Sequence, residues 1–249
     1  MTSAPELERI VSDLLHRAAL FRAAALGFAY PAPGHATQVR EALGRATAWD
    51  DGRPPGPSLT QALATAREAW SAALEPELRE EYARLFLGNP PCPLHETAYG
   101  DGRRIAGRPV ELADIGGFYA AFGMELSDAS PDLPDHLCSE LEFYSVLLVK
   151  LAYARSQGWT GRCQVTESAA RSFLDCHLGR WTGAFAAGLE EHAASAPYRD
   201  LAHFLKLLIA HECERLDVRP ALALGRLPSD EMQEERLVCP RAGRTPQAE

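Results

Sequence analysis

Residues 135–156, DHLCSELEFYSVLLVKLAYARS, carry the clearest structural signal in the chain. Their apolar side chains recur at intervals of three and four, which is the spacing of one face of an α-helix. That face holds Leu137, Leu141, Tyr144, Leu148 and Leu151. A helix with so continuous an apolar face must bury it against other elements, so this stretch predicts a core helix.

Helical signals continue on both sides of this stretch. Residues 3–6 (SAPE) and 58–61 (SLTQ) resemble the capping pattern of a helix start. In residues 164–194 a large side chain recurs at every fourth position: Phe173, His177, Trp181, Phe185 and Leu189. The predicted helices cover residues 3–27, a short stretch before residue 50, and residues 58–74, 77–87, 111–122, 135–156, 164–194 and 195–216. Because no segment alternates apolar and polar residues with period two, we predict an all-α, single-domain helical bundle.

Two loops and a tail complete this organisation. Residues 90–109 form a predicted long loop, in which Pro90, Pro91 and Pro93 favour an extended backbone. Residues 127–134 form a second, turn-rich linker. Prolines and charges dominate residues 220–249, so we predict a helical domain over residues 1–219 and an extended tail over residues 220–249. Four leucines of the tail could dock it: Leu222, Leu224, Leu227 and Leu237.

The composition restricts the class of protein. The 249 residues include 34 acidic and 25 basic side chains, a formal charge of −9, which disfavours nucleic acid and favours basic partners. The N-terminus lacks the basic start and apolar core of a secretory signal, and no apolar run is long enough to insert stably in a membrane. We therefore expect a cytoplasmic protein. Its six cysteines form no C-x-x-C pair, so we expect free, mostly buried thiols.

Acid, imidazole and acid gather in residues 131–141, PDLPDHLCSEL, at the first turn of the core helix. Asp132 or Asp135 suits the N-terminal backbone donors, and His136 and Glu140 lie one turn apart. A helix cap with an ion pair and a binding site are both compatible with this pattern. The spacing lacks the second histidine of an H-E-x-x-H metal site.

Other candidate residues give weaker signals. Tyr82, Leu85 and Phe86 share one helical face beside the long loop, and could be core residues or the floor of an exposed groove. His95 and Glu96 are adjacent in an extended segment and point apart, so we do not expect them to cooperate in catalysis. The run from His211 to Glu214 lies within an apolar helix and is interpreted as a coincidental cluster. No nucleotide-binding or nucleophile motif is present, so we predict no catalytic residue, no metal site, no cofactor and no enzyme activity.

Several stretches, in their order, resemble the TorD/DmsD/NarJ family of redox-enzyme maturation chaperones. They are YARLFLGNP at 82–90, PLHETAY at 93–99, PDLPDHLCSEL at 131–141, FLDCHLGRWTGAF at 173–185 and SAPYRDLA at 195–202. The resemblance extends over residues 5–216. The chain departs from the family pattern at His95, where an aromatic residue is usual, and at Ser130, where an acidic residue is usual.

The resemblance implies a TorD-like helical bundle that binds the apo catalytic subunit of a molybdopterin oxidoreductase, often through its N-terminal twin-arginine leader, until the molybdenum cofactor is inserted before export. A leader is basic and then apolar, so its receptor needs acidic groups beside an apolar groove. The predicted peptide-binding residues are Tyr82, Leu85, Phe86 and Pro93 as the floor, with Glu96, Asp135, His136 and Glu140 near the rim. Charge reversal at Asp135 is expected to weaken binding; if it unfolds the protein instead, Asp135 is structural. The tail and the lead-in to the 131–141 motif favour the subgroup that serves periplasmic dehydrogenases of the dimethyl-sulfide, selenate or ethylbenzene type.

Two other functions compete with this one. A helical adaptor or regulatory protein that binds another basic amphipathic helix would have the same proline loop and acidic residues. A metal-dependent hydrolase would use His136 and Glu140 with His177 or His211. The residues leave open whether the protein forms a homodimer and whether a guanine nucleotide binds weakly.

Overall fold

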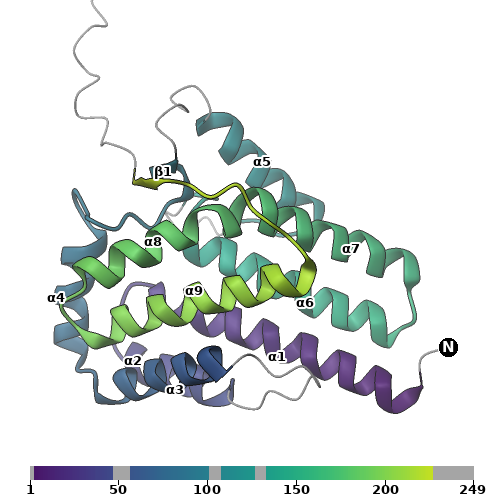
Figure 1. The fold of residues 1–249 in the computed structure, drawn as a ribbon, viewed down its shortest axis with the longest axis horizontal. Coiled ribbons are helices and arrows are strands. Elements are labelled where there is room, and N and C mark those ends of the chain that lie inside the picture. Colours follow the sequence, from purple (N-terminus) through teal and green to yellow (C-terminus); the bar gives the residue numbers. More distant parts are fainter. Residues whose placement is uncertain (1–2, 47–56, 101–107, 127–132, 227–249) are drawn as a thin grey trace, which may run out of the picture.

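The computed structural model describes residues 3–46, 57–100, 108–126 and 133–226 (Figure 1). Within these ranges the helices are α1 (Ala4–Phe28), α2 (His35–Arg45), α3 (Pro57–Ala72), α4 (Glu75–Phe86), α5 (Arg108–Ala121), α6 (Leu137–Ser156), α7 (Thr160–Phe173), α8 (Gly179–His192) and α9 (Ala196–Leu216). A short 3₁₀ turn, η1 (Glu96–Ala98), and a π-helical segment, η2 (Leu174–Leu178), join them. The two-residue strands β1 (Tyr99–Gly100) and β2 (Gly225–Arg226) pair antiparallel. The predicted all-α fold is confirmed.

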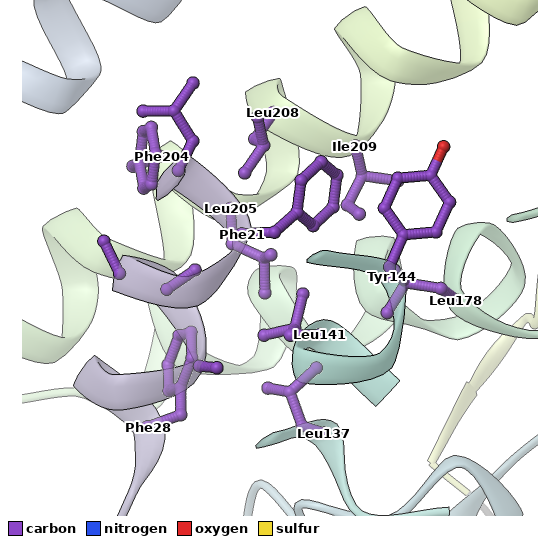
Figure 2. Close-up of a cluster of buried hydrophobic side chains, with 14 of the residues drawn as sticks. Phe21, Phe28, Leu137, Leu141, Tyr144, Leu178, Phe204, Leu205, Leu208 and Ile209 are labelled. Atoms are coloured by element: carbon purple, nitrogen blue, oxygen red, sulfur yellow. The ribbon is translucent and has the colours of Figure 1, made fainter. Parts of the chain in front are cut away.

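The core lies where α6 packs against α1 and α7, and where α9 packs against α3 and α8. Figure 2 shows α1, α6 and α9 meeting through Phe21 and Phe28, Leu141 and Tyr144, and Leu205. All five residues of the face predicted for residues 135–156 are buried, which confirms that α6 is a core helix. Burial of aromatic and leucine side chains on this scale supplies the main driving force for folding.

The helix starts were placed close to their positions, but their chemistry differs from the prediction. Ser3 and Ser195 both precede a helix with Pro in its first turn, yet neither side chain caps the helix. Just before α9 the carboxylate of Glu81 binds the backbone instead: its Oε1 accepts hydrogen bonds from the backbone N–H groups of Ala194, at 2.7 Å, and of Ser195, at 3.2 Å. Arg84 holds that carboxylate through two hydrogen bonds of 2.8 Å. A partner distant in the sequence therefore anchors the segment that leads into α9.

A buried ionic cluster joins three helices in the core. The guanidinium of Arg17 on α1 donates from Nε to Glu212 of α9 at 3.0 Å and from Nη1 to Asp13 at 3.3 Å. Tyr144 on α6 donates its hydroxyl to Glu212 at 2.8 Å. Glu212 has no exposed surface, so it belongs to a structural ion pair within the run predicted to be a coincidental cluster.

The long predicted helix over residues 164–194 is divided by a π-helical segment. Residues 174–178 form η2, and α8 begins directly after it at Gly179. A β-carbon at Gly179 would lie 2.4 Å from the carbonyl oxygen of Leu174 and 2.7 Å from Cγ of Pro220. Glycine is therefore required here by close approach of backbone and proline.

We call residues 218–226 the C-terminal strap, because they run back from the end of α9 along α8 to β1 (Figure 1). The chain turns at Asp217, which adopts a left-handed conformation with φ of 50°. The strap is held by its backbone: Ala223 N–H donates to the carbonyl of Arg180 at 2.9 Å, and β2 pairs with β1. Leu222 and Leu224 are exposed, whereas Leu227 and Leu237 lie outside the described residues. The division of the chain at residues 219 and 220 stays a prediction.

The structure also describes the state of the cysteines and the apolar character of the helices. The five cysteines in the described ranges are free thiols, of which Cys92 and Cys163 are buried and Cys176 is exposed; Cys239 lies outside them. Among the helices that the structure describes, none combines the length and the apolar character needed to cross a membrane.

We predict that Gly179→Ala lowers the free energy of unfolding by about 2 kcal/mol, because the added methyl group must displace backbone or proline atoms. Gly183→Ala, in the same helix, is the control. No atom lies within 4 Å of a β-carbon there, so this change should stabilise the protein by up to about 1 kcal/mol. Urea denaturation of both variants measures the difference. Equal effects at the two glycines would contradict the close packing of η2.

Candidate functional site

Residues 90–100, which we call the proline-rich segment, are attached to the start of α6 by backbone hydrogen bonds. Glu96 N–H donates to the carbonyl of Asp135 at 2.9 Å, and Leu137 N–H donates to the carbonyl of Leu94 at 2.8 Å. His95 and His136 thereby form an isolated antiparallel bridge. Two of the motif stretches singled out from the sequence, 93–99 and 131–141, are therefore in direct contact.

The side chain of Asp135 also binds the proline-rich segment. Its carboxylate has no exposed surface and accepts hydrogen bonds from the hydroxyl of Thr97 at 2.6 Å and the N–H of Thr97 at 3.2 Å. Nδ1 of His95 lies 3.2 Å from the other oxygen. Burial favours the neutral acid, but the hydrogen bonds from His95 and Thr97 outweigh it and hold the pKa of Asp135 below its ordinary range.

His136, rather than an aspartate, caps α6. Its Nδ1 accepts a hydrogen bond from the backbone N–H of Cys138 at 3.2 Å. This geometry requires an unprotonated Nδ1, so a neutral imidazole makes the cap. The prediction that Asp135 serves the helix N-terminus is therefore wrong, and Asp132 lies outside the described residues.

Glu140 is, like Asp135, a fully buried acid of the motif. It has no exposed surface, and its Oε2 accepts a hydrogen bond from the indole N–H of Trp181 at 3.1 Å. Burial, followed by the negative charge of Glu96, raises the pKa of Glu140 well above its ordinary value of 4.5. The fold therefore favours the neutral acid at Glu140 more strongly than at an exposed glutamate.

We call the hydrogen-bonded buried side chains around Asp135 and Glu140 the polar network. Glu96 connects this network to α5 through His177 of the π-helical segment. Nδ1 of His177 lies 3.0 Å from Oε2 of Glu96, and Nε2 lies 3.1 Å from Oδ2 of Asp114. The rings of Phe118 and Phe173 pack on the imidazole. An imidazole with a carboxylate at each nitrogen can donate to both only when it is doubly protonated. His177 thus bridges a buried carboxylate and one that is 62% exposed.

An open groove of about 1110 Å³ begins where this network ends. One wall is α5, the opposite wall is η2 with the start of α8, and residues 219–221 of the C-terminal strap close one side. Three carboxylates, from Glu111, Asp114 and Asp175, share the lining with Arg180 and Arg219. Among the network residues His177 is the one that also lines the groove. We call it the acidic groove because three carboxylates line it against two arginines, a net formal charge of −1.

The structure distributes the eight predicted peptide-binding residues between two locations. Tyr82, Leu85 and Phe86 are buried, with the Tyr82 and Phe86 rings packed on each other and on Tyr198. Glu96, Asp135, His136 and Glu140 are buried members of the polar network, and Pro93 is half-buried above it. None of the eight lines the acidic groove. Their direct contact with a peptide stays a prediction, and seven of the eight are buried in this arrangement.

Three residues of the network are absent from the predicted peptide-binding residues. The sequence pattern places His177 and Trp181 in a series of large side chains and offers His177 only to the hydrolase alternative, although a histidine and an indole N–H both need polar partners when buried. This need for a polar partner is the feature of the sequence that could have identified them. No such feature marks Asp114, because its role depends on how α5 packs against η2.

The hydrolase alternative depended on His136, Glu140 and a second histidine. No group of three or more His, Cys, Asp or Glu side chains in the described part of the chain is arranged to hold a metal ion. His136 is engaged as a helix cap and Glu140 with Trp181.

Comparisons with known proteins identify relatives of the chain. Residues 55–187 match the model of the family described as "Nitrate reductase delta subunit". The selenate reductase assembly chaperone protein of Thauera selenatis is 33% identical over 153 residues, which cover 60% of this chain and 75% of that protein. The chlorate reductase assembly chaperone protein of Ideonella dechloratans is 32% identical, covering 57% of this chain and 72% of that protein. The perchlorate reductase assembly chaperone protein of Dechloromonas aromatica is 30% identical, covering 46% and 54%.

We predict that Asp135→Asn lowers the free energy of unfolding by about 2 kcal/mol at pH 7, because a charged acceptor of several hydrogen bonds is lost. The lowered pKa of Asp135 means that its charge stabilises the fold above its ordinary pKa of 3.8, and that this contribution disappears as the pH falls through the folded-state pKa. The variant and the wild type should therefore converge at acid pH. Chemical denaturation from pH 3 to pH 7 tests this.

Asp217→Asn is the control for that measurement, since Asp217 is exposed and asparagine tolerates its left-handed backbone. A large loss of stability in Asp217→Asn, or none in Asp135→Asn, would contradict a structural role for Asp135. Full burial makes unfolding the expected result of charge reversal at Asp135.

Glu140→Gln should raise the free energy of unfolding at pH 8, by about 1 kcal/mol, because glutamine resembles the neutral acid. The pKa of Glu140 is raised in the folded state, so the folded protein binds more protons than the unfolded one above pH 4.5, and stability falls as the pH rises. The stability of Glu140→Gln should not show this fall with rising pH. Denaturation curves at pH 5 to pH 8 measure it, with Glu142→Gln on the exposed side of α6 as the control. A variant less stable than wild type at pH 8 would show that Glu140 is ionised.

Proposed function

The chain belongs to the nitrate reductase delta subunit family, and from that premise we propose that it is an assembly chaperone for the catalytic subunit of a molybdenum oxidoreductase. The relatives named as assembly chaperones for selenate, chlorate and perchlorate reductases support this function. The family match over residues 55–187 includes the proline-rich segment, the 131–141 motif and η2. The protein would act by binding its client and would not be an enzyme.

The observation that carries the proposal is the acidic groove beside the network formed by the motif residues. A client leader has a basic region followed by an apolar one, and a receptor for it needs carboxylates next to apolar surface. Glu111, Asp114 and Asp175 provide the carboxylates. Val110, which is 71% exposed at the edge of the groove, and Ala113 provide apolar surface on α5. This combination favours a basic, partly apolar segment as the guest.

The polar network is suited to fix the shape of this groove. Asp135 holds the proline-rich segment on α6, Glu96 of that segment meets His177, and His177 meets Asp114 on the opposite wall. In this proposal the residues of the 131–141 motif contribute to client binding mainly through that chain of contacts. Direct contact with the leader by the eight predicted residues is the stronger form of the same proposal.

The remaining features of the function are proposed on the family premise. We expect the chaperone to act in the cytoplasm, to bind the apo subunit through its twin-arginine leader, and to keep it competent for insertion of the molybdenum cofactor before export. A selenate reductase chaperone among the relatives supports the subgroup expected from the sequence. A homodimer is compatible with this function.

The adaptor alternative predicts the same acidic groove but a different partner. It would be favoured if the protein bound a basic helix equally well when that helix came from an unrelated protein.

Co-expression tests the proposed function. The tagged chain, produced with the molybdoenzyme subunit encoded beside it, should capture that subunit, and removal of the leader should reduce capture severalfold. Glu111→Gln combined with Asp114→Asn should reduce capture further at low salt, because both carboxylates line the groove. The control is Glu142→Gln with Asp217→Asn, which removes two exposed charges elsewhere. Equal capture of an unrelated protein with a basic helix would favour the adaptor function, and absence of capture would contradict the chaperone function.

A further inference from the structure

Arg180, the second residue of α8, occupies the acidic end of the groove. Its Nη1 lies 3.6 Å from a carboxylate oxygen of Glu111 and 4.0 Å from Oε1 of Glu96. Nη1 also donates to the carbonyl of Cys176 at 3.2 Å, and Nε donates to the carbonyl of Ala221 at 3.3 Å. A guanidinium of the chain itself therefore lies among carboxylate and carbonyl oxygens.

The contacts of Arg180 with the two carboxylates are long. Guanidinium groups that pair well with carboxylates donate two parallel hydrogen bonds of about 2.7–2.9 Å. Both distances from Nη1 exceed that range. Arg180 is only 19% exposed, so it gives up much of its hydration without gaining close ion pairs. A guanidinium that entered from the groove could approach these carboxylates more closely.

Arg180 lines the groove, whereas Glu96, 4.0 Å from its Nη1, does not. The Glu96 side chain is 3% exposed, whereas Asp114, at the other nitrogen of His177, is 62% exposed. Arg180 further holds the C-terminal strap, through Ala221 and through its own carbonyl to Ala223. Movement of this one side chain would uncover a buried carboxylate and loosen the strap that closes one side of the groove.

We propose, on the basis of the chaperone function proposed above, that Arg180 is an internal occupant of a guanidinium site, and that an arginine of the client leader displaces it from Glu96 and Glu111. The site then favours arginine over lysine, because Glu96 and Glu111 both lie within 4.0 Å of one guanidinium nitrogen, and a planar, forked donor can bond to two carboxylates where a point charge is less directional. Arg180 acts against binding of the guest, so the site accepts an arginine only where the apolar part of the leader also contributes.

Peptide binding to Arg180→Gln tests this inference. Glutamine keeps an N–H donor for the carbonyls of Cys176 and Ala221 but removes the competing charge. The probe is a fluorescein-labelled synthetic leader peptide with an adjacent arginine pair before an apolar stretch, compared with the same peptide carrying lysine or neutral citrulline at the pair. We expect Arg180→Gln to bind the arginine peptide about fivefold to tenfold more tightly than wild type, with a smaller gain at high salt. The citrulline peptide should show no gain.

Two controls separate this effect from a change in net charge or in fold. Arg180→Lys keeps the charge and should bind like the wild type. Arg22→Gln removes an equal charge from an exposed position of α1, a helix that contributes no residue to the groove lining, and should change affinity less than twofold. Melting curves accompany each titration. If Arg180→Gln does not fold, Glu111→Gln gives the second test, because loss of that carboxylate should weaken binding of the arginine peptide about fivefold.

The outcomes distinguish the two proposals. Tighter binding of the arginine peptide by Arg180→Gln alone supports the internal occupant. If wild type binds the leader but Arg180→Gln binds it equally or more weakly, the inference is overturned and the chaperone function stands. If neither the wild type nor the variant binds the arginine peptide and the client subunit is not captured, both proposals fail.

Discussion

The site depends on one buried contact, between the carboxylate of Asp135 and the 95–97 segment. A carboxylate without exposed surface is costly unless its oxygens are hydrogen-bonded, and the backbone and hydroxyl of Thr97 with His95 meet that need. Because those donors belong to the proline-rich segment, the segment can lie in only one position on α6. The prolines lower the entropic cost of holding it there.

From that position the remaining polar contacts follow in order. Glu96 is carried to His177, His177 reaches Asp114, and Glu140 is enclosed beneath Trp181. Each buried polar group is paired with a residue from another element, so loss of one leaves its partner unsatisfied. One turn beyond Glu140 on α6, Tyr144 joins α1, α6 and α9 in the same way through the Arg17–Glu212 pair. These two clusters hold the helices in a defined arrangement around the apolar core.

This arrangement gives the family motifs a physical meaning. Three stretches, at 93–99, 131–141 and 173–185, are each about 40 residues apart in the sequence, and the structure brings them together in one network beside an acidic groove. The conspicuous motif residues are mostly buried, and the groove is lined by residues that belong to less conspicuous positions of α5, η2 and the C-terminal strap. A motif can therefore mark the support of a binding surface as well as the surface itself.

The sequence by itself determined the all-α class, the approximate bounds of the helices and the buried face of α6, because helical periodicity and chain breaks are local properties. Only the tertiary structure decided that His136 caps α6, that Glu81 anchors the segment leading into α9, and that η2 interrupts a predicted continuous helix. It also decided that Tyr82 is a core residue and that Arg180 lies in the groove. These outcomes depend on which distant donor meets which acceptor and on which side chain fills a shared volume, and the spacing of residues along one helix contains neither.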